Sequence, residues 1–318
     1  MKSYLRNTPM IDITYRYQDK IGHIYTKLES YNPTGSIKDR IAAYIIDKAI
    51  ERGALKEGQP IIETTSGNTG IAIAAYGALK NHPVHIFMPD WTSVERVKLM
   101  KTYGAEVHLV TAKEGGFFGC LKKTSELADE LGGFRVNQFS NKDNFKAHYE
   151  STAVELLNQL PNVTDFISGV GSGGTIMGIG TRLKEANNAQ IIAIEPECAQ
   201  TLAGKPTTRL HKIEGIGDGF IPEIVNTGLI NKIIPINDDD AVAMAAKFAT
   251  ELGLGVGISS GANFLGAVLT NTDENRTVAT VFADDNKKYL STVLADSQKP
   301  KEGMLSYEIE LLDVHRIF

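Results

Sequence analysis

Cysteine is scarce in this sequence, and long apolar runs are lacking. Its two cysteines, Cys120 and Cys198, form neither a C-x-x-C pair nor a zinc-ligand spacing. We therefore expect a reducing, cytoplasmic setting. No apolar run is long enough to span a bilayer, and the N-terminus has no apolar segment typical of a signal peptide. A membrane partner is therefore not expected.

An excess of positive charge is also lacking. The chain has 33 basic and 38 acidic residues, and the net charge of −5 argues against nucleic acid as the main partner. None of the seven histidines shows H-E-x-x-H spacing, so the sequence predicts no metal site. The 318 residues suit one large domain or two closely packed ones.

Short apolar runs alternate with helical patterns along the chain. The runs predict strands over 61–64, 84–89, 106–110, 164–169, 191–195 and 277–283. One helix is predicted to begin with a capping box of Thr92 and Glu95, and another with Asp238 as its cap. The alternation predicts an α/β fold with mostly parallel sheets. Ligands of such sheets bind in the turns that follow the carboxyl ends of strands.

Four such turns are rich in glycine and hydroxyl residues: NPTGSIKDR (32–40), TTSGNTG (64–70), GVGSGGT (169–175) and GVGISSGA (255–262). Lys38 is predicted in the first turn of a helix, where the dipole lowers the pKa of its amine and favours a Schiff base with an aldehyde. The alternative is a surface lysine paired with Asp39. The other turns can bind an anion through backbone N–H groups, or simply cap their helices.

The third turn also supports a different cofactor. Gly169, Gly171 and Gly174 fit G-x-G-x-x-G, and Glu195 ends the next predicted strand, where an acid would bind a ribose hydroxyl. An NAD-dependent oxidoreductase is therefore an alternative, although it leaves the first two turns unexplained.

Taken together, the motifs PTGSIKDR, TSGNTG, GSGGT, GIG and GISSGA resemble the cysteine synthase family of pyridoxal-phosphate (PLP) enzymes, which includes O-acetylserine sulfhydrylases and cystathionine β-synthases. The resemblance implies fold-type II: two three-layer α/β domains with mostly parallel sheets, like the β chain of tryptophan synthase, and PLP in the cleft. The implied division is a smaller mobile domain at 35–140, a larger phosphate-binding domain from 1–34 and 141–295, and an extension at 296–318. An edge strand, a dimer contact or a mobile end would each suit that extension.

The same resemblance implies roles for individual residues. Lys38 would form the Schiff base with PLP and move the α-proton, Asn68 would contact the phenolic oxygen, and Ser259 would meet the pyridine nitrogen. The phosphate would rest on Gly171, Ser172, Gly173, Gly174 and Thr175. The substrate would be bound by Thr65, Ser66, Gly67, Thr69 and Gln138, with Gly215, Ile216 and Gly217 at the entrance.

The implied reaction is β-replacement or β-elimination on L-cysteine or O-acetyl-L-serine through an aminoacrylate, forming cysteine or releasing hydrogen sulfide. A serine at the pyridine nitrogen makes the ring a weaker electron sink than a carboxylate would, which favours loss of a β-leaving group. The family also implies a homodimer and a contact with serine acetyltransferase.

Asp218 departs from the family pattern, because cysteine synthases commonly have a small residue directly after GIG. A carboxylate there would repel hydrosulfide and could deprotonate water. The alternative function is therefore a hydrolytic L-cysteine desulfhydrase that gives serine and hydrogen sulfide. The other interpretation of Asp218 is a turn cap that faces solvent.

Overall fold

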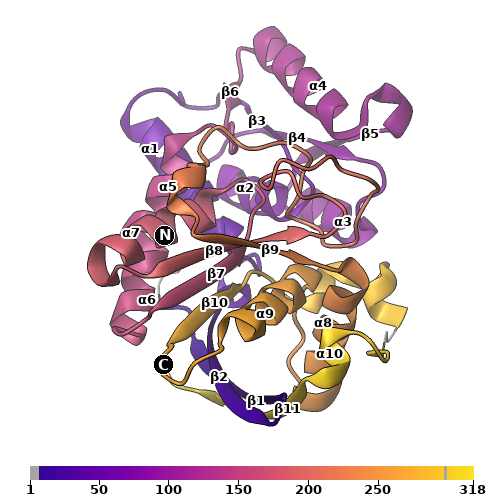
Figure 1. Cartoon of the computed structure of the whole chain (residues 1–318). Helices are drawn as coiled ribbons and strands as arrows, with labels where there is room; N and C mark the ends of the chain where they lie inside the picture. The colour runs from indigo at the N-terminus through magenta and orange to yellow at the C-terminus, as the bar shows by residue number, and fades with distance from the viewer. Residues whose placement is uncertain (1–6, 297–298) are drawn as a thin grey trace.

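The computed structural model of the chain describes residues 7–296 and 299–318. Residues 1–6 and 297–298, which fall in the predicted larger domain and C-terminal extension, lie outside the described residues. Two sheets form the framework (Figure 1). The larger has the order β11 (Glu310–Arg316), β1 (Met10–Tyr17), β2 (Lys20–Leu28), β10 (Val278–Phe282), β7 (Asp165–Gly169), β8 (Gln190–Pro196) and β9 (Lys232–Ile236). The smaller has the order β5 (Glu106–Val110), β4 (Val84–Pro89), β3 (Ile61–Thr64) and β6 (Phe134–Arg135).

Helices connect the strands of both sheets. They are α1 (Lys38–Glu51), α2 (Asn68–Leu79), α3 (Val94–Thr102), α4 (Gly116–Leu131), α5 (Lys142–Ala147), the π-helix η3 (His148–Thr152), α6 (Ala153–Gln159), α7 (Gly174–Asn187), α8 (Asp238–Leu252), α9 (Ile258–Thr270) and α10 (Leu305–Glu308). Every pairing in the smaller sheet is parallel, and β2, β10, β7, β8 and β9 pair in parallel in the larger one. The predicted α/β class with mostly parallel sheets is confirmed. No helix among the described residues is both long and apolar enough to cross a membrane.

The larger sheet is buried on both faces because its central strands, β10, β7 and β8, carry apolar side chains on both faces. In β8, Ile192 and Ile194 pack in the core formed with α8 and α9, whereas Ile191 and Ala193 pack in the core formed with α6 and α7. Successive side chains of a strand point to opposite faces, so a continuous apolar run supplies two cores at once.

The smaller sheet is also covered by helices on both faces, but the hydrophobic cluster on one face is smaller. Ile86 and Met88 of β4 pack on the side of α1 and α2, and Phe87 packs with Cys120 of α4 on the other. This sheet lies within 35–140, and the division of the chain at those residues stays a prediction.

Two predicted helix caps are wrong. Helix α3 has Ser93 at its N-cap, and the Thr92 hydroxyl donates to the carbonyl of Pro89 rather than closing a box with Glu95. Helix α8 is capped by Asn237, whose side chain accepts from the amides of residues 239 and 240. Within the C-terminal extension, β11 pairs antiparallel with β1 as an edge strand.

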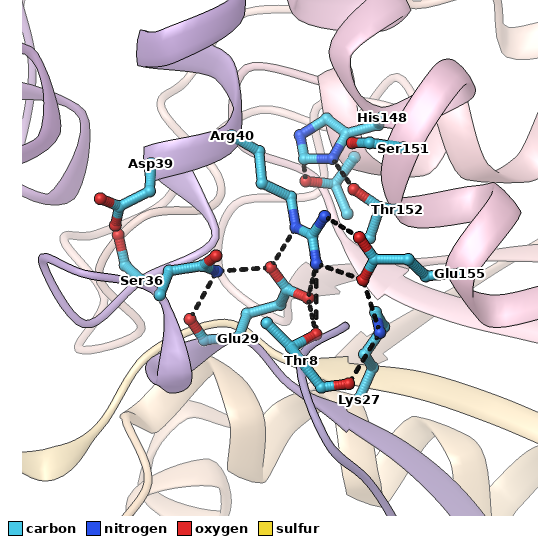
Figure 2. Close-up of polar contacts among 12 residues, drawn as sticks. Thr8, Lys27, Glu29, Ser36, Asp39, Arg40, His148, Ser151, Thr152 and Glu155 are labelled. Carbon is cyan, nitrogen blue, oxygen red and sulfur yellow. Dashed lines mark hydrogen bonds and ion pairs between the residues drawn. The ribbon is translucent and has the colours of Figure 1, made fainter. Parts of the chain in front are cut away.

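A buried ion network fixes the start of α1 (Figure 2). Arg40 donates to both oxygens of Glu29, at 2.6 and 2.9 Å, and to both oxygens of Glu155, at 2.9 and 2.8 Å. Lys27 lies 2.9 Å from Glu155, and Thr8 donates to Glu29 at 2.8 Å. Lys27, Glu29 and Arg40 are 0%, 0% and 3% exposed. The network therefore ties β2, α6 and α1 together two residues after Lys38.

Replacing Arg40 by methionine is expected to destabilise the fold by about 3–5 kcal/mol, because two buried carboxylates are then left with one lysine. Urea unfolding followed by circular dichroism measures this. The matched control is Arg16→Met, which removes an exposed ion pair with Glu310 and is expected to cost about 1 kcal/mol or less. Equal losses in the two variants would contradict the assigned role of the network.

The same network predicts a pH dependence. Burial would raise the pKa of Glu29 and of Glu155, but Arg40 and Lys27 together outweigh burial and hold both pKa values below the ordinary range. Groups with a lowered folded-state pKa stabilise the fold at neutral pH and lose that contribution as the pH falls through the lowered values. The stability difference between wild type and Arg40→Met is therefore expected to be full at neutral pH and to shrink in acid. A difference that grows in acid would exclude this account.

Candidate active site

One pocket gathers residues from all four glycine-rich turns. Its lining residues include those at the starts of α1, α2, α7 and α9. The predicted site residues that line it are Lys38, Thr65, Ser66, Asn68, Thr69, Gln138, Gly171, Ser172, Gly173, Thr175, Gly215, Ile216, Asp218 and Ser259. Gly67, Gly174 and Gly217 are chain neighbours of lining residues but are not lining residues themselves.

Lys38 is half-buried and projects into this pocket rather than onto the surface. The Asp39 carboxylate instead accepts from the Thr34 amide at 3.1 Å and from the Thr34 hydroxyl at 2.7 Å. The surface-lysine alternative is therefore wrong. Burial lowers the pKa of the Lys38 amine, although the charges of Asp218 and Asp284 oppose the shift. A lowered pKa makes the neutral, nucleophilic amine more available.

The second turn is held from both sides. The Thr69 hydroxyl donates to Gln138 Oε1 at 2.8 Å, and Gln138 Nε2 donates to the carbonyl of Thr64 at 2.9 Å. Asn68 Nδ2 donates to Asp284 Oδ2 at 2.8 Å. Asn68 Oδ1 is buried without a hydrogen-bond partner among the described residues, so it can interact with a bound group.

The third turn is supported by two residues of the α5–η3 region. Asn144 Nδ2 donates to Ser172 Oγ at 3.0 Å, and His148 Nε2 lies 3.4 Å from Thr175 Oγ1. Burial holds the pKa of His148 well below its usual value, with Lys38 and Arg40 adding to the effect. Gly173 has φ of 87°, which lets the turn direct backbone N–H groups from the start of α7 toward an anion.

The fourth turn and the GIG segment complete the pocket. Ser259, the second residue of α9, lines it, whereas Ser260 does not. Asp218 is half-buried in the pocket, not turned fully to solvent. Burial raises the pKa of its carboxyl, and His211 and Lys38 oppose that rise.

Aromatic side chains and one ion pair border the pocket. Phe117 and Phe139 line it, and Phe220 packs on both, with ring centroids 6.3 and 5.0 Å away. Arg96, from α3, pairs with Glu214, which directly precedes the GIG segment. A side chain at Gly67 would place its Cβ 2.1 Å from Arg96 Cδ, so a larger residue there would displace Arg96.

Sequence patterns missed four supporting residues: Asp284, Asn144, His148 and Arg96. Each contacts a motif residue from a distant part of the chain, so no local spacing marks it. Glu195, the acid of the predicted NAD site, is not a lining residue. Its carboxylate accepts from the amides of Leu202 and Ala203, at 2.6 and 3.2 Å.

Known proteins are similar to this chain in sequence and in architecture. Residues 1–284 match the family model described as pyridoxal-phosphate dependent enzyme. A cysteine synthase of Staphylococcus aureus is 41% identical over 292 residues, which cover 90% of this chain and 94% of the relative. The crystal structure of a hydrogen sulfide-producing enzyme from Fusobacterium nucleatum is similar with a TM-score of 0.93 and 46% identity, covering 99% of this chain and 97% of that one.

Two further structures are similar. A variant of the F. nucleatum enzyme, with one aspartate changed to asparagine and in complex with an α-aminoacrylate intermediate, has a TM-score of 0.95 and 45% identity, covering 99% of this chain and 98% of that one. A cysteine synthase of Entamoeba histolytica has a TM-score of 0.87 and 37% identity, covering 96% and 92%. The cofactor of the family is PLP, so the NAD alternative is wrong. The chain belongs to the pyridoxal-phosphate dependent enzyme family, among the cysteine synthase-like enzymes of fold-type II.

Proposed function

We propose that this PLP enzyme acts on the β-carbon of L-cysteine, releases hydrogen sulfide and adds water to give L-serine. The observation that carries the proposal is the position of Asp218, whose carboxylate lies in the same pocket as Lys38, close enough for each charge to shift the pKa of the other. The similarity to the sulfide-producing enzyme over 99% of this chain supports the same direction.

The pocket residues divide the work of binding. Bound PLP supplies the electron sink that makes the α-proton acidic and lets the β-substituent leave. Ser172, Thr175 and the amides at the start of α7 suit its phosphate, and Ser259 suits its pyridine nitrogen. Thr65, Ser66, Gly67 and Thr69, at the start of α2, suit the substrate carboxylate, because a helix N-terminus favours an anion. Gln138 accepts a hydrogen bond from Thr69 and completes this group.

Two side chains handle protons in this proposal. The Lys38 amine, with its lowered pKa, moves the α-proton. Once the C–S bond has broken and sulfide has left, Asp218 takes a proton from water while the C–O bond to the β-carbon forms. Cysteine and water thus balance serine and hydrogen sulfide. The same carboxylate repels hydrosulfide, which opposes the reverse reaction.

The aromatic border favours a small second substrate. Phe117 and Phe139 place apolar rings in the pocket, and Phe220, two residues after Asp218, packs on both. Water and small thiols suit this space. Cysteine synthesis from O-acetyl-L-serine and sulfide is the second candidate, because the cysteine synthase of S. aureus is 41% identical to this chain.

One assay panel on the purified enzyme separates the two. It offers cysteine alone, cysteine with a second thiol, and O-acetyl-L-serine with sulfide. Serine formation from cysteine as the fastest reaction supports the proposal, and cysteine formation as the fastest reaction excludes it. We also propose a cytoplasmic homodimer, and a contact with serine acetyltransferase stays a prediction.

Changing Asp218 to asparagine is expected to slow serine formation from cysteine by about 10²–10⁴-fold, because the general base is lost. Exchange of the β-substituent with an added thiol is expected to persist, because a thiolate needs no base. The control is Glu223→Gln, which removes an exposed carboxylate five residues along the same segment. Serine formation at the wild-type rate in the asparagine variant would overturn the role of Asp218.

The pH profile gives an independent test. Burial raises the pKa of Asp218 above the usual carboxyl range, and a base works only when ionised. The rate of serine formation is therefore expected to rise as the pH rises through this raised pKa. In Asp218→Asn this acidic limb of the pH–rate profile is expected to be absent. An unchanged acidic limb in the variant would assign that limb to another group.

Cofactor retention is expected to depend on Gly171. A Cβ at this position would lie 2.1 Å from the carbonyl oxygen of Gly215, so Gly171→Ala must push the turn away from the GIG segment. Overpacking of this kind costs about 1–3 kcal/mol, or ~10–100-fold in PLP affinity. Titration of the apoenzyme with PLP, followed by visible absorbance, measures it. Gly228→Ala, outside the pocket, is expected to bind PLP like wild type. Equal PLP affinities of Gly171→Ala and Gly228→Ala would contradict the placement of the cofactor beside Gly171.

A further inference from the structure

A second cluster of chemically active side chains lies in the smaller sheet, away from the PLP pocket. His85 belongs to β4, and Glu106 and His108 belong to β5. Among the described residues these three bring one ligand atom each to within 4.8 Å of the others. We propose that His85, Glu106 and His108 bind a divalent cation of the zinc class, with three protein ligands and a fourth position open to solvent.

The sheet register creates this cluster. His85 is the register partner of Glu106, and Phe87 is the register partner of His108. Because side chains alternate along a strand, all four project from one face, the face on which α4 packs. Phe87 and His108 stack with ring centroids 4.5 Å apart and planes 18° apart. That contact fixes the orientation of the His108 ring before any ion arrives.

The distances decide between a cation and hydrogen bonds. His85 Nδ1 and His108 Nε2 lie 3.4 Å apart. His85 Nδ1 lies 3.5 Å from Glu106 Oε2, and His108 Nε2 lies 3.5 Å from the other oxygen, Oε1. Hydrogen bonds with a nitrogen donor are usually about 2.7–3.2 Å long, so all three separations are too long for good ones. Ligands about 2.0–2.1 Å from a tetrahedral zinc ion lie about 3.3–3.4 Å from each other. The 3.4 Å separation of the two imidazole nitrogens matches an edge of that tetrahedron, and Glu106 brings one carboxylate oxygen to within 4.8 Å of both nitrogens.

The chemistry of the donors also suits a cation. Two imidazoles and one carboxylate form a ligand set used by zinc sites that keep one open position. Glu106 has 65% of its side chain exposed, which leaves room for a water on the fourth position.

The cluster is separate from catalysis. His85 and Glu106 lie at the amino ends of parallel strands, whereas the PLP pocket lies at the carboxyl ends. A bound ion would join the edge strand β5 to β4 and would stabilise the smaller sheet. Cys120 packs with Phe87, but its sulfur is not among the ligand atoms that meet in this cluster. The inference therefore does not rest on the proposed reaction.

The test is zinc binding by the PLP-loaded enzyme, prepared without a histidine tag and stripped with a chelator. Equilibrium dialysis against zinc, with metal analysis of the protein, counts the ions bound per chain. Wild type is expected to bind one zinc ion at this site. Substitution of cobalt for zinc is expected to give the visible bands of an ion with four ligands. His108→Phe keeps the stack on Phe87 but removes a ligand, and is expected to weaken zinc binding by about 100-fold or more.

Glu106→Gln is the second variant, because its exposed side chain can change without loss of the fold. It is expected to weaken zinc binding in the same direction. Glu126→Gln, an exposed carboxylate of α4 paired with Lys122, is the control of equal charge and is expected to bind zinc like wild type. Binding unchanged in both His108→Phe and Glu106→Gln, or no binding in wild type, would overturn the proposal. PLP absorbance in every variant reports whether the fold is intact.

Discussion

The ion network around Arg40 is the constraint from which the position of Lys38 follows. Two carboxylates and two cations lie together out of water, and each guanidinium nitrogen of Arg40 faces an oxygen of Glu29 or Glu155. An apolar cluster of similar volume would stabilise the fold at least as well. The planar guanidinium adds specificity of orientation, because its N–H groups donate only in fixed directions. The first turn of α1, and with it the amine of Lys38, is thereby fixed relative to β2 and α6.

The pocket then balances charge between backbone and side chains. Four helices, α1, α2, α7 and α9, begin around it, and their N-termini make the space favourable for anions. A substrate carboxylate and a cofactor phosphate suit that field. Asp218 and Asp284 place two carboxylates in or beside the same space and keep it from being uniformly positive. Burial meanwhile lowers the pKa of Lys38. One site can therefore hold anions and still offer a neutral amine.

The sequence predicted what local patterns determine. The bounds of β3, β4 and β5 agree with the predicted runs, because each run is rich in β-branched residues and is followed by a polar turn. The cap at Asp238 failed because its carboxylate accepts from Arg209, 29 positions earlier, while Asn237 takes the cap. Asn144 and Asp284 escaped prediction for the same reason: their partners, Ser172 and Asn68, are remote in sequence. Local spacing therefore shows which residues could cap a helix or line a site, and long-range contacts determine which of them do.

The two ends of the smaller sheet show why the cation site could not be found by motif. At the carboxyl ends, the chemistry sits in turns, where adjacent residues stay together in the sequence. At the amino ends, His85 and Glu106 are 21 positions apart and meet only through strand register. Two imidazole nitrogens 3.4 Å apart gain little from facing each other unless something positive lies between them. A proton would draw them closer, to hydrogen-bond length. The observed 3.4 Å spacing of the two nitrogens fits a larger cation.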